Sequence, residues 1–518
     1  MNYFLIKNHS DPARVIHKIR ISSITSHKHI IFPPNISEIK FCSEFNTSLD
    51  NIIFPDSIES IIFPSKYNQP LDNFIFPPNL KSLTFKQDFD QSLNNIHLPS
   101  KLESIIFSEK FNKSLDKVHL PNSIQNISFG SEFNQSLGAV IFPSNLKSMT
   151  FGKNFNQSLD NVVFPSSLLS IVTESVSSCL FFNVNPVMQS LESIEFNRFY
   201  NMSIHNIIFP SSLKHLIFGW AFNQPLDNIY FPDALQSLII HGEFNKPIDN
   251  IHFPSALRTL EFGIRFNQDI SHIILPSELQ ILIFGSSFNQ TLKYLKLPFD
   301  LKILTFGQQF NQSIDNITLP SNLQTLTFGN KFNQYFKDII LPSSLQILIF
   351  GNKFNQSLET VNFPYNLRTL VLDEFFNQPL THVKLPPNLE SLEFGICYRQ
   401  SLEHIILPQN LKSITFKGDL NNITLPPHLE TIIFGRHFNQ PINKLPNSIT
   451  HLSFYKISHK HLTNLPSSIK KITIHDNKYE DRCKLKVPHG CIIVDSNNDE
   501  ILPVGDDTFI DKYKDYDM

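Results

Sequence analysis

The sequence predicts a repeat solenoid that is mostly β, with about 21 stacked coils of about 22 residues whose strands form a parallel sheet. Three observations predict this fold. A proline preceded by Phe or Leu recurs at a fixed interval, the residues between these prolines follow one apolar pattern, and a single unit is too short to bury its own apolar side chains.

The proline marks one position in each unit. It recurs every 22 residues in two series, which are separated by a one-residue slip of register. The prolines are Pro33, Pro55, Pro77, Pro99, Pro121, Pro143 and Pro165, then Pro210, Pro232, Pro254, Pro276, Pro298, Pro320, Pro342, Pro364, Pro386 and Pro408. The last units are shorter, because Pro426 follows after 18 residues and Pro446 and Pro466 after 20 each.

The apolar pattern within a unit is typical of β-strands joined by turns. In residues 143–164, Met149 and Phe151 alternate as in a strand, and Val162 and Phe164 follow the same spacing before the next proline. The segment F-G-K-N-F-N between them has turn chemistry. We therefore expect at least one short strand in each coil, and apolar residues at equivalent positions should stack.

One Phe position should form an internal column along the solenoid. Its members are Phe133, Phe155, Phe222, Phe244, Phe266, Phe288, Phe310, Phe332, Phe354 and Phe376. Removing one of these rings should cost about 3–5 kcal/mol of stability.

These units resemble the FNIP repeat family, whose name stands for a Phe-Asn-x-Pro core. FNQPL at Phe222 and Phe376, FNKPI at Phe244 and FNQPI at Phe438 match the core best, and most other units have Ser in place of the Pro. The resemblance covers about residues 12–474 and implies a leucine-rich-repeat-like fold. It also implies an origin among social amoebae or the giant DNA viruses that infect amoebae.

The sequence departs from related patterns in two places. L-x-x-L-x-F matches the leucine-rich strand, but Asn355 lies five residues after Phe350, where a leucine-rich repeat usually has its Asn three residues after. Many family members begin with an F-box that recruits a ubiquitin ligase. Here repeat spacing already appears at Ile16, Ile19 and Ile21, which leaves too few residues upstream for that module.

The predicted organisation has three parts. Residues 1–11 form an N-terminal cap, residues 12–474 the FNIP-type solenoid, and residues 475–518 a capping coil with an acidic tail. The coil near residues 172–188 is irregular, either through decay of the repeat or as a contact loop. The tetrapeptide SHKH starts at Ser26 and again at Ser458. It is interpreted as a polar turn rather than a metal site, because no further ligands accompany it.

Bulk properties exclude several classes of function. The net charge is −3, and the five cysteines are scattered, which favours a reducing compartment over a disulfide framework. No secretory signal, membrane-spanning run or catalytic motif is present. We expect no enzyme activity, no cofactor, no metal, no small-molecule substrate, no nucleic acid and no membrane partner. The expected location is intracellular, in the cytoplasm, which would be the host cytoplasm if the chain is viral.

The outward positions of the central strands are small or β-branched and uncharged. This pattern reflects either strand propensity or a protein-binding face. The candidate partner-binding residues are Ile217, Ile239, Ile281, Ile283, Ile303, Thr305, Thr327, Ile347 and Ile349. The favoured function is a non-enzymatic protein-protein interaction scaffold. The alternatives are a structural or self-assembling repeat protein, and a substrate adaptor for ubiquitin ligases without its own F-box.

The triplet Asn355-Gln356-Ser357 matches the acceptor pattern for N-glycosylation. The equivalent Asn333 is followed by Gln334 and Tyr335, so the pattern is lost there while the Asn remains. We therefore interpret the Asn as part of an amide ladder that satisfies backbone groups at the turn, and we expect no glycan on Asn355.

Overall fold

The computed structural model describes most of the repeats. The described residues are 3–5, 18–21, 32, 36–50, 52–159, 161–174, 190–205, 207–315, 317–337, 339–395, 397–400, 405–416, 424–435, 438, 442, 445–456, 465–475 and 487–500. The chain divides into two compact units, Met1–Gly263 and Ile264–Met518. The SHKH tetrapeptides, residues 175–189, Cys483 and the tail after residue 500 lie outside the described residues.

Each described coil contributes one short strand. The first unit holds β1 (Tyr3–Leu5), β2 (Lys18–Ile21), β3 (Glu38–Phe41), β4 (Ser60–Phe63), β5 (Ser82–Phe85), β6 (Ser104–Ile106), β7 (Asn126–Ser128), β8 (Ser148–Phe151), β9 (Ser170–Thr173), β10 (Ser193–Phe196), β11 (His215–Phe218), β12 (Ser237–Ile240) and β13 (Thr259–Phe262). The second unit holds β14 (Ile281–Ile283), β15 (Ile303–Thr305), β16 (Thr325–Thr327), β17 (Ile347–Phe350), β18 (Thr369–Leu372), β19 (Ser391–Phe394), β20 (Ser413–Phe416), β21 (Thr431–Phe434), β22 (His451–Phe454), β23 (Lys471–Ile474) and β24 (Ile492–Val494).

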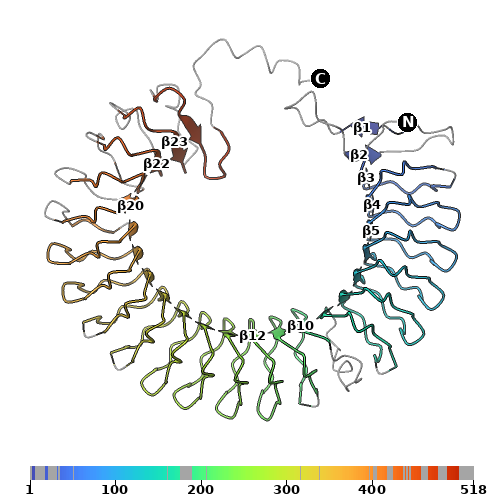
Figure 1. The fold of residues 1–518 in the computed structure, drawn as a ribbon, viewed down its shortest axis with the longest axis horizontal. Helices are drawn as coiled ribbons and strands as arrows, with labels where there is room; N and C mark the ends of the chain where they lie inside the picture. The colour runs from blue at the N-terminus through green and yellow to red at the C-terminus, as the bar shows by residue number, and fades with distance from the viewer. Residues whose placement is uncertain are drawn as a thin grey trace. The chain divides into compact units, whose positions relative to one another are not determined.

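Consecutive strands pair in parallel within each unit, which confirms the predicted solenoid. Strands β2 to β13 pair in chain order, and so do β14 to β24. The exception is β1, which pairs antiparallel with β2. In each unit taken by itself, the strands line the inner side of a curved stack of coils (Figure 1). The described residues contain no helix.

In the described coils, the second strand-like segment of the repeat does not form a strand. Val162 and Phe164 are buried and Val163 is exposed, so the alternation is as expected. However, the Val162 N–H donates to the Leu159 carbonyl at 3.0 Å, within its own coil. This turn uses the N–H that a second sheet would need, and the same bond recurs in other coils.

The core of each coil is continuous with the core of its neighbours. In the coil of residues 342–363, Leu345, Leu348, Phe350, Phe354 and Leu358 are fully buried. The predicted Phe column is also confirmed. The Phe332 ring lies between the rings of Phe310 and Phe354, with centroids 6.1 and 6.0 Å away and planes within 8° of parallel.

Tyrosine takes the Phe position in three coils. The residues are Tyr67, Tyr200 and Tyr398, and their rings stack in the column like the phenylalanines. The hydroxyl oxygens of Tyr67 and Tyr398 are buried without a hydrogen-bond partner among the described residues. Burial raises the pKa of the Tyr67 and Tyr398 phenols well above their ordinary value.

Glycine follows many strands because neighbouring coils approach closely there. A Cβ built on Gly329 would lie 1.7 Å from the carbonyl oxygen of Gly307 in the preceding coil. No side chain can occupy that space without displacing the backbone. Gly138 stands at a different position of its coil and has more space. A Cβ built on it would lie 3.8 Å from the nearest atoms.

The Asn residues after the Phe column form the predicted ladder between coils. The Oδ1 atom of Asn333 accepts the backbone N–H of Asn355 at 2.9 Å and the Nε2 of Gln356 at 2.9 Å. The N–H of Asn333 donates in turn to Oδ1 of Asn311 at 2.9 Å. Each Asn thus ties its own turn to the turn of the next coil.

The ladder tolerates an acidic residue in place of the Asn acceptor. Asp90 stands at the Asn position, and its Oδ1 accepts the N–H of Asn112 at 2.9 Å. The residue after Asn112 is Lys113, at a position that is Gln in most coils. Its Nζ lies 2.7 Å from Oδ2 of Asp90. An acid and a base replace two amides with the same connectivity.

Candidate binding surfaces

Seven of the nine predicted site residues lie together in the second unit. They belong to the outward positions of β14, β15, β16 and β17, where each strand alternates half-buried and buried side chains. We call the outward residues of these four strands the central strip: Ile281, Ile283, Ile303, Thr305, Thr325, Thr327, Ile347 and Ile349. Thr325 was not among the predicted site residues, but it occupies the same face.

Strand register aligns the strip in two parallel rows. Ile281 lies opposite Ile303, and Thr325 lies opposite Ile347. In the second row Ile283 lies opposite Thr305, which lies opposite Thr327. Because paired parallel strands are about 4.8 Å apart, side chains in one row touch their neighbours and form a continuous surface. The strip is therefore an uncharged face of β-branched side chains.

The other two predicted residues lie in the first unit. Ile217 on β11 is opposite Ile239 on β12, and both are half-buried at outward positions. Ile239 is followed in the same row by Glu261 on β13. These two isoleucines form a pair rather than a strip.

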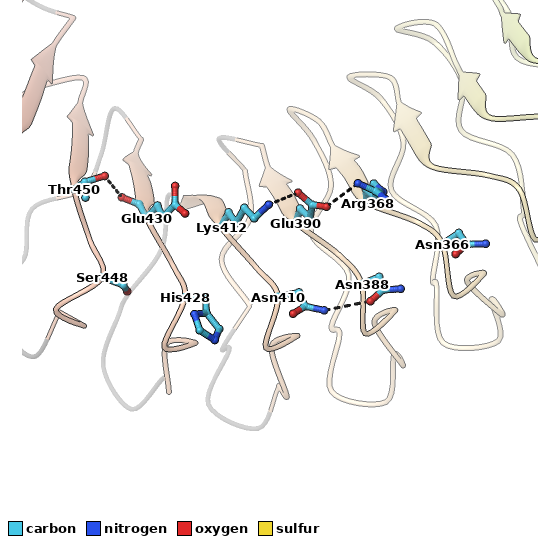
Figure 2. A pocket seen from close by; sticks show the side chains of 10 residues that line it. All are labelled: Asn366, Arg368, Asn388, Glu390, Asn410, Lys412, His428, Glu430, Ser448 and Thr450. Carbon is cyan, nitrogen blue, oxygen red and sulfur yellow. Dashed lines mark hydrogen bonds and ion pairs between the residues drawn. The ribbon is translucent and has the colours of Figure 1, made fainter.

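A polar groove in the second unit was not predicted. It has a volume of about 700 Å³ and lies beside the strands of five successive coils, β18 to β22 (Figure 2). One row of its lining is Asn366, Asn388, Asn410, His428 and Ser448, and the other is Arg368, Glu390, Lys412, Glu430 and Thr450. The two rows occupy fixed positions, two and four residues after the proline, in each coil.

Charges in the groove are largely compensated. The Glu390 carboxylate accepts Nη1 of Arg368 at 3.1 Å and Nζ of Lys412 at 2.7 Å. The hydrogen bond from Lys412 holds the pKa of Glu390 below its ordinary value. The structure shows no partner for the carboxylate of Glu430 or the ring of His428 among the residues it describes. The groove offers hydrogen-bonding groups to a polar segment and has no net formal charge.

The residues that line the groove follow a pattern that is visible in the sequence. This pattern is not a motif confined to those coils. Asn366-x-Arg368 and Asn388-x-Glu390 recur at one offset from the proline. Polar residues recur at this offset throughout the chain, so the sequence does not show which coils form a hollow. That depends on how far neighbouring side chains extend.

The described residues contain no group of three or more His, Cys, Asp or Glu placed to hold a metal ion. Among them, no helix is long and apolar enough to cross a membrane. Cys491 is half-buried, and burial raises the pKa of its thiol.

Comparison with known proteins gives one family. The FNIP repeat model matches residues 67–110, 111–140, 133–172, 189–220, 200–243, 244–287, 288–331, 332–375, 376–419, 420–456 and 438–477. Comparison with functionally curated proteins found no match.

Among solved structures, the chain is similar to CroV588, a giant-virus protein described as a novel circular leucine-rich-repeat protein. The two are 32% identical with a TM-score of 0.68, over 89% of this chain and 75% of that one. The structure of the Toll–Spatzle complex of Drosophila matches at 12% identity and a TM-score of 0.51, over 94% of this chain and 70% of that one. YopM from Yersinia enterocolitica matches at 17% identity and a TM-score of 0.44, over 81% and 83%.

Proposed function

The chain belongs to the FNIP repeat family, and from that premise we propose that it is a non-enzymatic scaffold whose protein partner docks on the central strip. Its leucine-rich-repeat-like solenoid is a fold typical of protein-interaction scaffolds and of a class that is generally non-enzymatic. The proposal includes an intracellular location, in the cytoplasm. It rests on one observation, the chemistry of the strip.

The strip differs from the same face elsewhere. At the first outward position of their strands, Ser60, Ser82 and Ser104 stand where the strip has isoleucine. The fold therefore does not require isoleucine at that position, and strand propensity alone does not explain why it gathers on β14, β15 and β17. Contiguous apolar side chains on a surface are typical of interaction sites.

The strip itself carries no charged residue. In the second unit, the second outward row continues past the strip to Glu393 on β19. Beside the strip, Lys302 donates to Oε1 of Gln280 at 3.0 Å. An uncharged centre with a polar margin is the usual composition of a protein interface. A partner with a flat, uncharged face fits this arrangement.

Capture of partners from lysate of the native host, followed by mass spectrometry, tests the proposal. The informative variant combines Ile283→Asp and Ile349→Asp. It should fold, because Glu261 and Glu393 already occupy the same position in their own strands. A protein captured by the wild type and lost by this variant supports docking on the strip.

Ile340→Asp is the matched control. Ile340 lies between β16 and β17, outside the strands, and its side chain is 87% exposed. This substitution makes the same chemical change away from the strip, so it should leave capture unchanged. If the double variant retains every partner of the wild type, the strip is not the docking site.

A further inference from the structure

We propose that Arg198, Phe199 and Trp220 in the first unit form a site for a single carboxylate carried on an otherwise apolar segment of a protein partner. The proposal goes beyond the docking of a partner on the central strip and does not depend on it. It rests on three features of the turns after β10 and β11: exposed aromatic rings, a cation that contacts both of them, and the lack of an acidic partner for that cation among the described residues.

The exposed rings follow from how the turn is built. Tyr200 occupies the buried column, and its N–H donates to the Asn197 carbonyl at 3.1 Å to close the turn. Phe199, one residue earlier, is therefore directed outward and is 54% exposed. Trp220, in the next coil, is 41% exposed. Many other coils have polar residues at these positions, such as Ser131 and Glu132.

The two turns are fixed relative to each other. The Ala221 N–H donates to the Arg198 carbonyl at 2.7 Å, so adjacent coils are tied at the site itself. Met202, in the same coil as Arg198, is also 45% exposed and adds to the apolar surface of that coil. The apolar groups are thus carried on a backbone that is already ordered before any partner arrives.

The guanidinium of Arg198 contacts both rings. Its Cζ lies 5.8 Å from the ring centroid of Phe199 and 5.7 Å from the ring of Trp220. Neither ring has an oxygen or nitrogen acceptor, so these contacts leave the N–H donors of the guanidinium available. Those donors match the two oxygens of a carboxylate.

Arg198 has no ion pair among the residues that the structure describes. Several exposed cations elsewhere in the unit do have one. Lys110 pairs with Asp88 at 2.8 Å and Lys214 with Glu192. Arg198 instead combines an available charge with aromatic neighbours, which is the composition of an interaction hot spot.

The surroundings favour one carboxylate over a polyanion. Binding to nucleic acid needs several cations, because each neutralised phosphate contributes to affinity. Here β10 itself carries the exposed Glu195, and the turn after β12 carries Glu243. A lone guanidinium with acidic residues on neighbouring elements fits an Asp or Glu side chain with apolar neighbours.

Trp220 is the only tryptophan in the chain, so its fluorescence reports directly on the site. The probe is the acetylated and amidated peptide Gly-Leu-Glu-Leu-Gly, compared with the same peptide carrying Gln in place of Glu. With the full chain, the Glu peptide should give a saturable change in Trp emission and bind at least tenfold more tightly than the Gln peptide. Arg198→Gln should remove this preference while its circular dichroism and melting temperature stay those of the wild type.

Lys293→Gln is the matched control, because Lys293 also lies over a ring, 5.2 Å from the centroid of Tyr294. It should leave the titration unchanged. Equal affinity for the two peptides, an unchanged preference in Arg198→Gln, or no saturable response would each overturn the proposal. Tighter binding of inorganic phosphate than of the Glu peptide would also overturn it, since the site would then select phosphate.

Discussion

Replacing Asn333 by alanine should destabilise the second unit by about 2 kcal/mol. The Oδ1 atom of Asn333 accepts two hydrogen bonds from the next coil, from the N–H of Asn355 and from Nε2 of Gln356, each at 2.9 Å. Each such bond is worth about 0.5–1.5 kcal/mol, so losing both should cost about 1–3 kcal/mol. The variant keeps the hydrogen bond from its own backbone N–H to Oδ1 of Asn311, and it keeps all of its core contacts.

The control for this prediction is Asn333→Asp. Asp90 shows that a carboxylate can accept the ladder hydrogen bond with the same 2.9 Å geometry. The Asp variant should therefore retain more than half of the stability that the Ala variant loses. Urea unfolding monitored by circular dichroism measures the stability of both variants. The urea midpoints are compared between proteins whose unfolding transitions have the same m-value. An Ala variant as stable as the wild type, or an Asp variant as unstable as the Ala variant, would refute the ladder as a source of stability.

The remaining predictions concern three positions. Tyr67→Phe should raise the free energy of unfolding by about 1–3 kcal/mol in a urea titration, because it removes a buried hydroxyl with no described partner. Since burial holds the pKa of Tyr67 above its ordinary value, the unfolded chain ionises first, and wild-type stability should fall as pH rises above about 10, less steeply in Tyr67→Phe. Gly329→Ala should lower the melting temperature by an amount equivalent to about 1–3 kcal/mol, whereas Gly138→Ala, which meets nothing closer than 3.8 Å, should not lower it. Mass spectrometry of protein from its native source should find Asn355 unmodified, and a glycan there would contradict the intracellular location.

Features that repeat were accessible from the sequence. Phe332 and its equivalents occupy one environment in coil after coil, so their period alone predicts that they stack. The role of Asn333 followed from the retention of Asn where Ser is replaced by Tyr335. In both cases one physical cause acts at every coil, and a sequence of many coils samples it repeatedly.

Two kinds of feature were not accessible. The first is backbone bonding within a coil: Val162 is buried beside an exposed neighbour as in a strand, but its N–H is used by a turn. The second kind depends on two unlike coils. The groove needs particular lengths of side chain at Glu390 and Lys412 in successive coils. Arg198 and Trp220 are 22 positions apart in sequence and contact each other only because the coils stack. Periodicity averages over such differences, so only coordinates reveal them.

The affinity of the captured partner for three forms of the chain tests the central claim most directly. Isothermal titration should show at least a tenfold weaker dissociation constant for the variant with Ile283→Asp and Ile349→Asp than for the wild type. Ile340→Asp should change it less than twofold. Equal affinities for the wild type and the double variant would contradict docking on the central strip.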